Sequence, residues 1–149
     1  MTDMLVKLYD LPAQTPHPLI RRGISPEKHI VVEWVQKHFS EYWRSEADVA
    51  FHRDPVSCFL AVDNGTLLGF ACYDTTRRGF FGPTGVAEAA RGRGLGRALL
   101  LTCLHDMFAQ GYGYAIIGGV GPIDFYAGAV GATVIENSTP GVYAGMLRT

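Results

Sequence analysis

The chain has 149 residues, 48% of them hydrophobic, and a formal net charge of −1. This length and apolar content suffice for one hydrophobic core and leave little for a second, so we expect a single domain over residues 1–149. The near-neutral charge argues against a nucleic-acid partner, because a surface that neutralises phosphates usually makes the whole domain basic.

The first elements expected in chain order are two helices. Ser25 supplies an N-cap and Pro26 occupies the first helical position, and apolar residues then recur at helical spacing as far as His38. A second, shorter helix is expected after Ser40. The sequence therefore predicts that helices precede the sheet.

Three strands are expected next. Two apolar runs, residues 58–62 and 67–73, flank the turn 63–66, whose Asn-Gly pair favours a type I′ turn, so they predict a β-hairpin. Another turn leads to a strand over about residues 80–86. Because Gly82, Pro83 and Gly85 interrupt that strand, we expect a β-bulge or an edge strand there.

The most informative stretch of the sequence is Arg91-Gly92-Arg93-Gly94-Leu95-Gly96-Arg97. Glycines at alternate positions let the backbone approach a ligand, and the apolar run behind them predicts a helix whose first turn contains them. Unpaired N–H groups in that turn and the three arginines favour an anion, and a diphosphate is the expected ligand.

Beyond the end of this helix near residue 111, the sequence predicts four more elements. They are a strand at residues 114–118, a short helix at 122–128, and two last strands at 133–136 and 142–147.

Two common phosphate-binding motifs do not fit this run. A P-loop ends in lysine followed by serine or threonine, and no such lysine is present. A dinucleotide-binding turn has the spacing Gly-x-Gly-x-x-Gly and an acidic residue about 20 positions later. The spacing here is Gly-x-Gly-x-Gly, and residues 112–119 contain no carboxylate. The run therefore indicates another kind of anion site.

An arginine, two glycines and a later aromatic pair identify that kind of site. Arg91, Gly94 and Gly96 form an (Gln/Arg)-x-x-Gly-x-(Gly/Ala) signature, and Phe125 and Tyr126 follow about thirty residues later. This pattern resembles the GNAT superfamily of acyl-CoA-dependent N-acyltransferases, over most of the chain from about residue 20. The resemblance implies an α+β fold in which helices flank a mixed, mostly antiparallel sheet whose parallel fourth and fifth strands splay apart.

The same resemblance implies a reaction, in which a primary amine of a small acceptor attacks the thioester of acetyl-CoA directly. Backbone groups of the fourth strand, at Thr84 and Val86, would bind pantetheine, and residues 91–97 would hold the diphosphate. Tyr126 is the expected acid, because a phenol of pKa near 10 stays protonated at pH 7 and can donate to the departing thiolate. The alternative for Tyr126 is simple core packing. The expected partners are CoA, the amine and a second copy of the chain in a homodimer.

The general base is left open by the sequence. An alkylamine of pKa near 10 is neutral only about once in a thousand molecules at pH 7, so some group or water chain must accept its proton. Many members of the family use a glutamate on the fourth strand, but residues 80–86 contain none. Glu46, Asp74 and Glu88 are candidates by position, and each is alternatively a solvated surface carboxylate.

Cysteine and histidine usage bounds the remaining chemistry. Cys58, Cys72 and Cys103 lie among apolar residues, so we expect buried free thiols in a reducing cytoplasm, with a catalytic cysteine as the alternative. The five histidines show no metal-ligand spacing with cysteines or carboxylates, so no metal is expected. No apolar run approaches the roughly 18 residues of a membrane span, and no signal peptide is visible, so no membrane partner is expected.

Two other functions remain open beside acetyl transfer. A non-catalytic acyl-CoA-binding or sensing domain would explain the missing strand glutamate. It would also explain Gly131, which follows Tyr126 by five residues where the family commonly has four. A second departure from the family pattern is Gly119, where the family commonly has asparagine. The third possibility is a structural or interaction module whose glycines only form a tight turn. An assay with acyl-CoA distinguishes the three functions. Turnover favours acetyl transfer, binding of CoA without turnover favours the binding or sensing domain, and absence of binding eliminates both.

Overall fold

The centre of the molecule is a seven-stranded sheet in the order β2-β3-β4-β5-β6-β1-β7. The computed structural model describes residues 1–14 and 16–148. All neighbouring strands pair antiparallel except β5 and β6, which are parallel. The strands are β1 (Thr2–Lys7), β2 (Ile20–Arg22), β3 (Cys58–Asp63), β4 (Thr66–Tyr73), β5 (Phe80–Val86), β6 (Tyr114–Val120) and β7 (Thr133–Ile135). The mixed, mostly antiparallel sheet expected from the sequence is therefore present.

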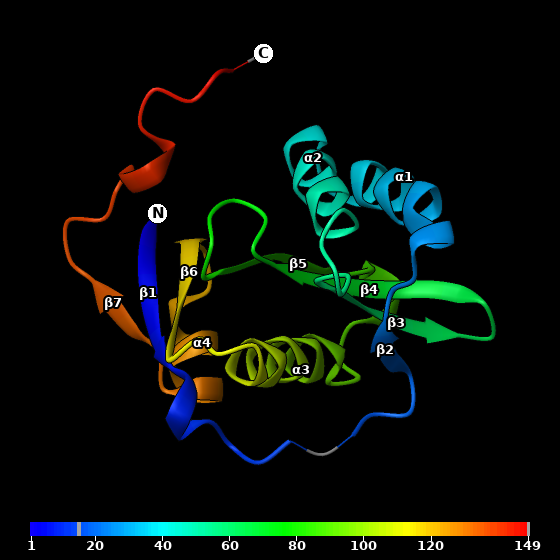
Figure 1. The fold of residues 1–149 in the computed structure, drawn as a ribbon, viewed down its shortest axis with the longest axis horizontal. Coiled ribbons are helices and arrows are strands. Elements are labelled where there is room, and N and C mark those ends of the chain that lie inside the picture. Colours follow the sequence, from blue (N-terminus) through cyan, green and yellow to red (C-terminus); the bar gives the residue numbers. More distant parts are fainter. Residues whose placement is uncertain (15, 149) are drawn as a thin grey trace.

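Helices cover both faces of this sheet (Figure 1). Helices α1 (Lys28–His38) and α2 (Glu41–Ala50) lie on one face, and α3 (Leu95–Ala109) and α4 (Ile123–Val130) lie on the other. Each face has its own apolar core, with Val35 and Phe70 in the first and Phe81 and Leu99 in the second. The sheet thus separates two layers of side chains.

The cap and turn predicted between residues 40 and 66 are confirmed, and the start of the first helix is not. Asn64 and Gly65, between β3 and β4, have φ angles of 49° and 75°, and two positive values are what a type I′ turn requires. Helix α2 begins after Ser40, whose Oγ accepts the Trp43 N–H. Helix α1 begins two residues later than predicted, because residues Ser25–Glu27 form a 3-10 turn before it.

The parallel strands β5 and β6 separate soon after they meet. Their pairing joins Phe80 to Ile116 and Phe81 to Ile117 and extends no further. On its other side, β5 shifts register against β4 between Phe81 and Thr84, as expected of a bulge. The splay and the irregular strand predicted from the sequence are both confirmed.

Predictions for the two ends of the chain were wrong. Helices do not come first, because β1 and β2 precede them, and β1 lies between β6 and β7. The strand predicted at residues 142–147 is absent, since Gly141–Tyr143 form a 3-10 turn and residues 144–148 pair with no strand. The N-terminal strand buries Met4 and Val6 in the core, whereas Leu147 is 89% exposed. The N-terminal segment therefore joins the sheet, because its apolar side chains are buried there, and the C-terminal segment stays outside it.

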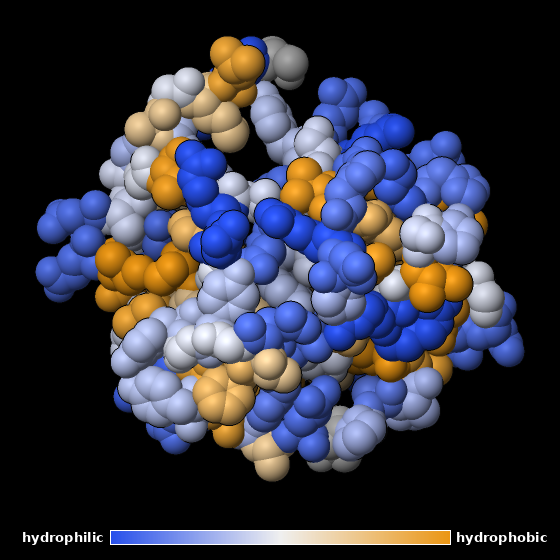
Figure 2. All heavy atoms as spheres, in the orientation of Figure 1, coloured by the Kyte–Doolittle hydropathy of each residue, from blue (hydrophilic) through white to orange (hydrophobic). Residues whose placement is uncertain are grey.

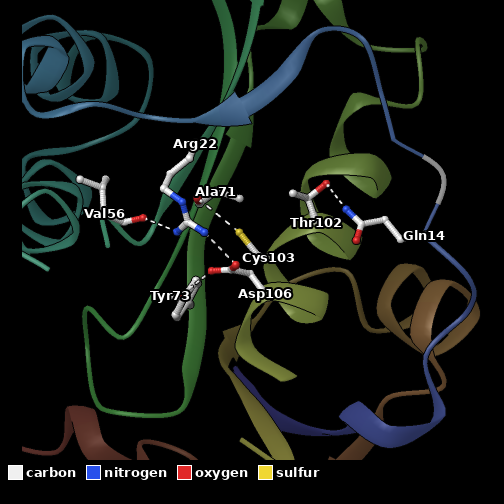
Figure 3. A network of polar contacts seen from close by, with 8 residues as sticks. All are labelled: Gln14, Arg22, Val56, Ala71, Tyr73, Thr102, Cys103 and Asp106. Atoms are coloured by element: carbon white, nitrogen blue, oxygen red, sulfur yellow. Dashed lines mark hydrogen bonds and ion pairs between the residues drawn. The ribbon is translucent and has the colours of Figure 1, made fainter. Parts of the chain in front are cut away.

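A polar network joins β2 and β4 to α3 (Figure 3). Arg22 donates to Asp106 Oδ1 at 2.8 Å and to the Val56 carbonyl at 2.7 Å, and its guanidinium lies 4.7 Å from the centre of the Phe59 ring. The Tyr73 hydroxyl donates to the other Asp106 oxygen. Burial, together with Asp106, raises the pKa of Tyr73, so the phenol remains a donor. The network fixes α3, and with it the glycine run at its start.

Candidate active site

The glycine run forms the wall of a cavity of about 230 Å³ near the end of β5. The residues that line this cavity come from β5, the loop before α3, the first turn of α3 and the start of α4. They are Val86, Ala90, Arg91, Gly92, Gly94, Leu95, Gly96, Arg97 and Phe125. Most of the residues predicted to hold a diphosphate are thus brought together, and Ala90 and Phe125 join them. Phe125 could have been included from the sequence, since it belongs to the aromatic pair.

Two of these glycines are required by the backbone. Gly92 and Gly94 have φ angles of 83° and 74°, a left-handed conformation that L side chains rarely adopt. A Cβ atom built on either would meet no atom within 4 Å, so the space in front of both is open cavity. Gly94 is the N-cap of α3, and only Gly96 lies in the first helical turn. The expectation that this turn contains all the glycines was wrong, since the others lie in the loop before it.

The start of α3 presents unpaired N–H groups. Bonding inside the helix begins with the Ala98 N–H, which donates to the Gly94 carbonyl at 3.1 Å, and no side chain caps the preceding N–H groups. These groups carry the positive end of the helix dipole, and Arg91 and Arg97 line the same cavity. An anion is the ligand that such a cavity suits.

Arg93 and Thr84 stand apart from the cavity, although both were predicted to bind the same ligand. The Arg93 guanidinium lies 3.7 Å from the carboxylate of Asp63, the last residue of β3. The Thr84 hydroxyl donates to the Phe70 carbonyl at 3.1 Å. The Arg93 side chain therefore contacts β3, and the Thr84 side chain contacts β4.

The backbone of Val86 faces the splay. The next residue, Ala87, donates its N–H to the Leu68 carbonyl at 2.8 Å, toward β4. Backbone polar groups alternate sides along a strand, so the N–H and C=O of Val86, and those of Thr84 two residues earlier, point away from β4. Since β6 has left β5 by this point, these groups are open to a ligand.

Tyr126 lies where the splay begins. Its ring packs edge-on against Phe81, with centroids 6.5 Å apart, and against Phe125 at 5.1 Å, and Phe81 is the last residue of β5 that pairs with β6. Burial raises the pKa of its hydroxyl. No described residue hydrogen-bonds this hydroxyl, yet no described side-chain N or O atom is both buried and unpaired. The hydroxyl oxygen therefore keeps some access to solvent, although the ring is buried.

The two departures from the family pattern are accommodated locally. Gly131 caps the C-terminal end of α4 in a left-handed conformation, with a φ angle of 67°. Gly119 has a φ angle of 58°, and its N–H donates to Asp3 Oδ1 at 2.9 Å. The longer interval to Gly131 thus only lengthens a helix that still holds Tyr126 against Phe81.

The three candidate bases lie in different environments. Glu88 is exposed on the loop before the glycine run. Asp74 holds the β4–β5 loop, because its carboxylate accepts the Gly79 N–H at 2.7 Å and the Tyr112 hydroxyl at 2.8 Å. Glu46 is half-buried on α2, where it accepts a hydrogen bond from Thr76, and burial raises its pKa. Of the three, Glu46 has the environment of a proton acceptor.

The cysteines are free and buried, as expected. Burial raises the pKa of the Cys72 and Cys103 thiols well above the ordinary value, which disfavours the nucleophilic thiolate. Within residues 1–14 and 16–148, His, Cys, Asp and Glu side chains nowhere form a group of three that could hold a metal ion. In the same part of the chain, no helix combines the length and apolar character of a membrane span.

The sequence matches the acetyltransferase (GNAT) family over residues 22–128. A search of curated proteins gives no significant match. Among solved structures, a GCN5-related N-acetyltransferase from Sphaerobacter thermophilus has 24% identity and a TM-score of 0.69, covering 90% of this chain and 48% of that protein. The glucosamine N-acetyltransferase region of a fungal multi-domain GH3 β-N-acetylglucosaminidase has 15% identity and a TM-score of 0.70, covering 90% of this chain and 19% of that one.

A GNAT-family structure from Novosphingobium aromaticivorans has 16% identity and a TM-score of 0.59, covering 90% of this chain and 60% of that protein. This chain thus spans only 19% to 60% of the length of these three proteins. At these identities the likenesses establish the fold. The family match, in contrast, extends over most of the chain and includes both the glycine run and the Phe-Tyr pair. The chain belongs to the GNAT acetyltransferase family.

Proposed function

We propose that this protein transfers the acetyl group of acetyl-CoA to a primary amine of a small acceptor. The observation that supports the proposal is the placement of three kinds of group along one opening in the sheet. The glycine-lined cavity presents N–H groups and arginines, Val86 presents free backbone groups, and Tyr126 stands where β5 and β6 part.

The donor would bind through main-chain groups. The N–H groups at the start of α3, with Arg91 and Arg97, would hold the diphosphate of CoA, because they supply directed donors and positive charge. The free backbone groups of Thr84 and Val86 would pair with the amides of pantetheine, as an added strand pairs with a sheet edge. The left-handed Gly92 and Gly94 leave the room that a diphosphate needs.

The reaction would proceed by direct attack. The neutral amine nitrogen bonds to the thioester carbonyl carbon, and the tetrahedral intermediate collapses by breaking the carbon–sulfur bond. Tyr126 would give its proton to the departing thiolate, and its raised pKa keeps it protonated at neutral pH. The proton that the nitrogen loses on forming the amide replaces the one that Tyr126 donated, so protons and charges balance.

The test is an amine-dependent assay with the purified protein. Acetyl-CoA is incubated with a panel of small primary mono-, di- and polyamines, free CoA is followed with a thiol reagent, and the acetylated amine is identified by mass spectrometry. We expect CoA release that depends on the amine and matches the product. Calorimetry with CoA separates the other possibilities: binding without turnover would indicate an acyl-CoA-binding or sensing domain, and absence of binding would refute both functions.

A further inference from the structure

A half-buried carboxylate without a counter-ion lies on the face of the sheet opposite to α3 and α4. Glu46, on α2, accepts a hydrogen bond from the Thr76 hydroxyl in the β4–β5 loop. Among the residues that the structure describes, no lysine, arginine or histidine forms an ion pair with it. A carboxylate removed from water without a cation favours either a proton or a cationic ligand.

Tyr143 connects this carboxylate to the splay. Thr76 also lies close enough to Tyr143 to lower the pKa of its hydroxyl, against the larger effect of burial, which raises that pKa. The Tyr143 hydroxyl lies 2.7 Å from where a Cβ atom on Gly118 would stand, so it contacts the β6 backbone closely. Gly118 directly follows Ile117, the last residue of β6 that pairs with β5. Tyr143 thus reaches the start of the splay from the α1/α2 face, at the level where Phe81 holds Tyr126 on the other face.

The position of Tyr143 is fixed from both ends of its segment. The 3-10 turn Gly141–Tyr143 begins beside the buried Asp3, whose Oδ2 would lie 3.4 Å from a Cβ atom on Gly141. Further along, the Leu147 carbonyl accepts the Tyr42 hydroxyl of α2 at 3.3 Å. Figure 2 shows a hollow between this C-terminal segment and α2.

The charges that act on Tyr143 are negative. Burial is the main cause of its raised pKa, and the charges of Glu46 on α2 and Asp3 on β1 raise it further. Burial is also the main cause of the raised pKa of the Cys72 thiol on β4, to which Glu46 adds a smaller effect. No arginine, lysine or histidine affects the pKa of Glu46, which burial raises and the Thr76 hydrogen bond lowers. Such a cluster favours an acceptor that arrives as an alkylammonium cation, whose charge would replace the missing counter-ion.

We propose that Glu46 is the proton acceptor for the incoming amine and that Tyr143 and Thr76 pass the proton to it. This inference rests on the proposed acetyl transfer. The ammonium gives a proton to the Tyr143 oxygen while Tyr143 gives its own proton to the Thr76 oxygen, and Thr76 gives its proton to Glu46 Oε2. One proton moves from nitrogen to carboxylate, and the nitrogen lone pair becomes free to attack the thioester.

The test compares Glu46→Gln with Glu41→Gln, the same change on an exposed residue of the same helix. Each is assayed with two amines: the best alkylamine of the panel, which is protonated at pH 7, and an alkoxyamine, which is already neutral there. We expect Glu46→Gln to lower kcat/KM for the alkylamine about 100-fold and to make it rise steeply with pH, because solution deprotonation then replaces the relay. With the alkoxyamine it stays within about twofold of wild type, and Glu41→Gln matches wild type with both amines.

Tyr143→Phe provides the second arm, because it breaks the relay and keeps the carboxylate. It is expected to reproduce the selective loss with the alkylamine. An equal loss with both amines would show that Glu46 and Tyr143 only support the fold, and an unchanged pH profile in Glu46→Gln would overturn the assignment while leaving acetyl transfer intact. Failure of the wild-type protein to acetylate any amine would overturn the proposed function and this inference together.

Discussion

Replacing Gly94 with valine separates the backbone requirement of the glycine run from its role in binding. The φ angle of 74° is left-handed, and holding an L residue there costs about 1–2 kcal/mol. A Cβ atom at this position meets nothing within 4 Å, so no steric clash is added. At about 2–4 °C per kcal/mol for a chain of this size, the melting temperature should fall by about 2–8 °C.

The effect on CoA affinity should be larger than the effect on stability. The new side chain projects into the space that the diphosphate would occupy, in front of the N–H groups at the start of α3. A hydrogen bond to a charged group contributes about 1.5–3 kcal/mol. Loss of two such bonds amounts to at least about 3 kcal/mol, which is roughly a hundredfold weaker affinity.

Two further variants make this result interpretable. Gly111→Val places the same residue at the other end of α3, where φ is 106° and a Cβ atom also meets nothing within 4 Å, so it should cost stability without weakening CoA binding. Gly94→Asn should recover much of the stability, since asparagine tolerates the left-handed conformation, but not the affinity. Calorimetry with CoA and thermal melts measure both quantities. A folded Gly94→Val protein that binds CoA within about threefold of wild type would refute the reasoning, as would an equal loss of affinity in Gly111→Val.

Three other predictions concern single side chains. Arg93→Ala should weaken CoA binding less than Gly94→Val does, because its guanidinium is directed at Asp63, and calorimetry that shows the reverse order would contradict this. Tyr126→Phe should lower turnover by about 10²- to 10⁴-fold with CoA affinity unchanged, and turnover within about twofold of wild type would show that the tyrosine only packs. Asp106→Ala should lower the free energy of unfolding in urea by about 2 kcal/mol or more, because Arg22 and Tyr73 lose their acceptor. Asp48→Ala, at a side chain that is 43% exposed, should change it by less than about 1 kcal/mol.

The parts of the fold that the sequence predicted are those fixed by neighbours in the chain. The turn at Asn64-Gly65 and the cap at Ser40 depend on a few adjacent residues, and both are found where expected. The cavity is a similar case, because most of its lining comes from the short interval between Val86 and Arg97. Among the residues that line the cavity, only Phe125 lies further along the chain, and it belongs to the Phe-Tyr pair identified in the sequence.

The parts that the sequence did not predict depend on distant pairing. Strand β1 is short and lies at the N-terminus, and its partners are β6 and β7, more than a hundred residues away, so nothing next to it in the chain indicates a strand. The C-terminal residues 142–147 have an apolar content that resembles a strand, but they join no strand and leave Leu147 exposed, which the local sequence does not indicate. The left-handed backbone at Gly119 also depends on a distant residue, because its N–H donates to the Asp3 carboxylate. The triad of Glu46, Thr76 and Tyr143 comes from three segments with no shared motif, and only the fold shows it.

The splay determines where the proposed chemistry can occur. In a continuous sheet, side chains from opposite faces cannot act on one bond, because the backbone ladder lies between them. Here the ladder between β5 and β6 ends at Phe81 and Ile117. Phe81 contacts Tyr126 on the α3/α4 face, and the residue after Ile117 is the glycine under which Tyr143 approaches from the α1/α2 face. In the proposed reaction, a thioester placed in this opening would therefore meet Tyr126, the proposed proton donor, on one side and the amine on the other, without either helix pair having to move.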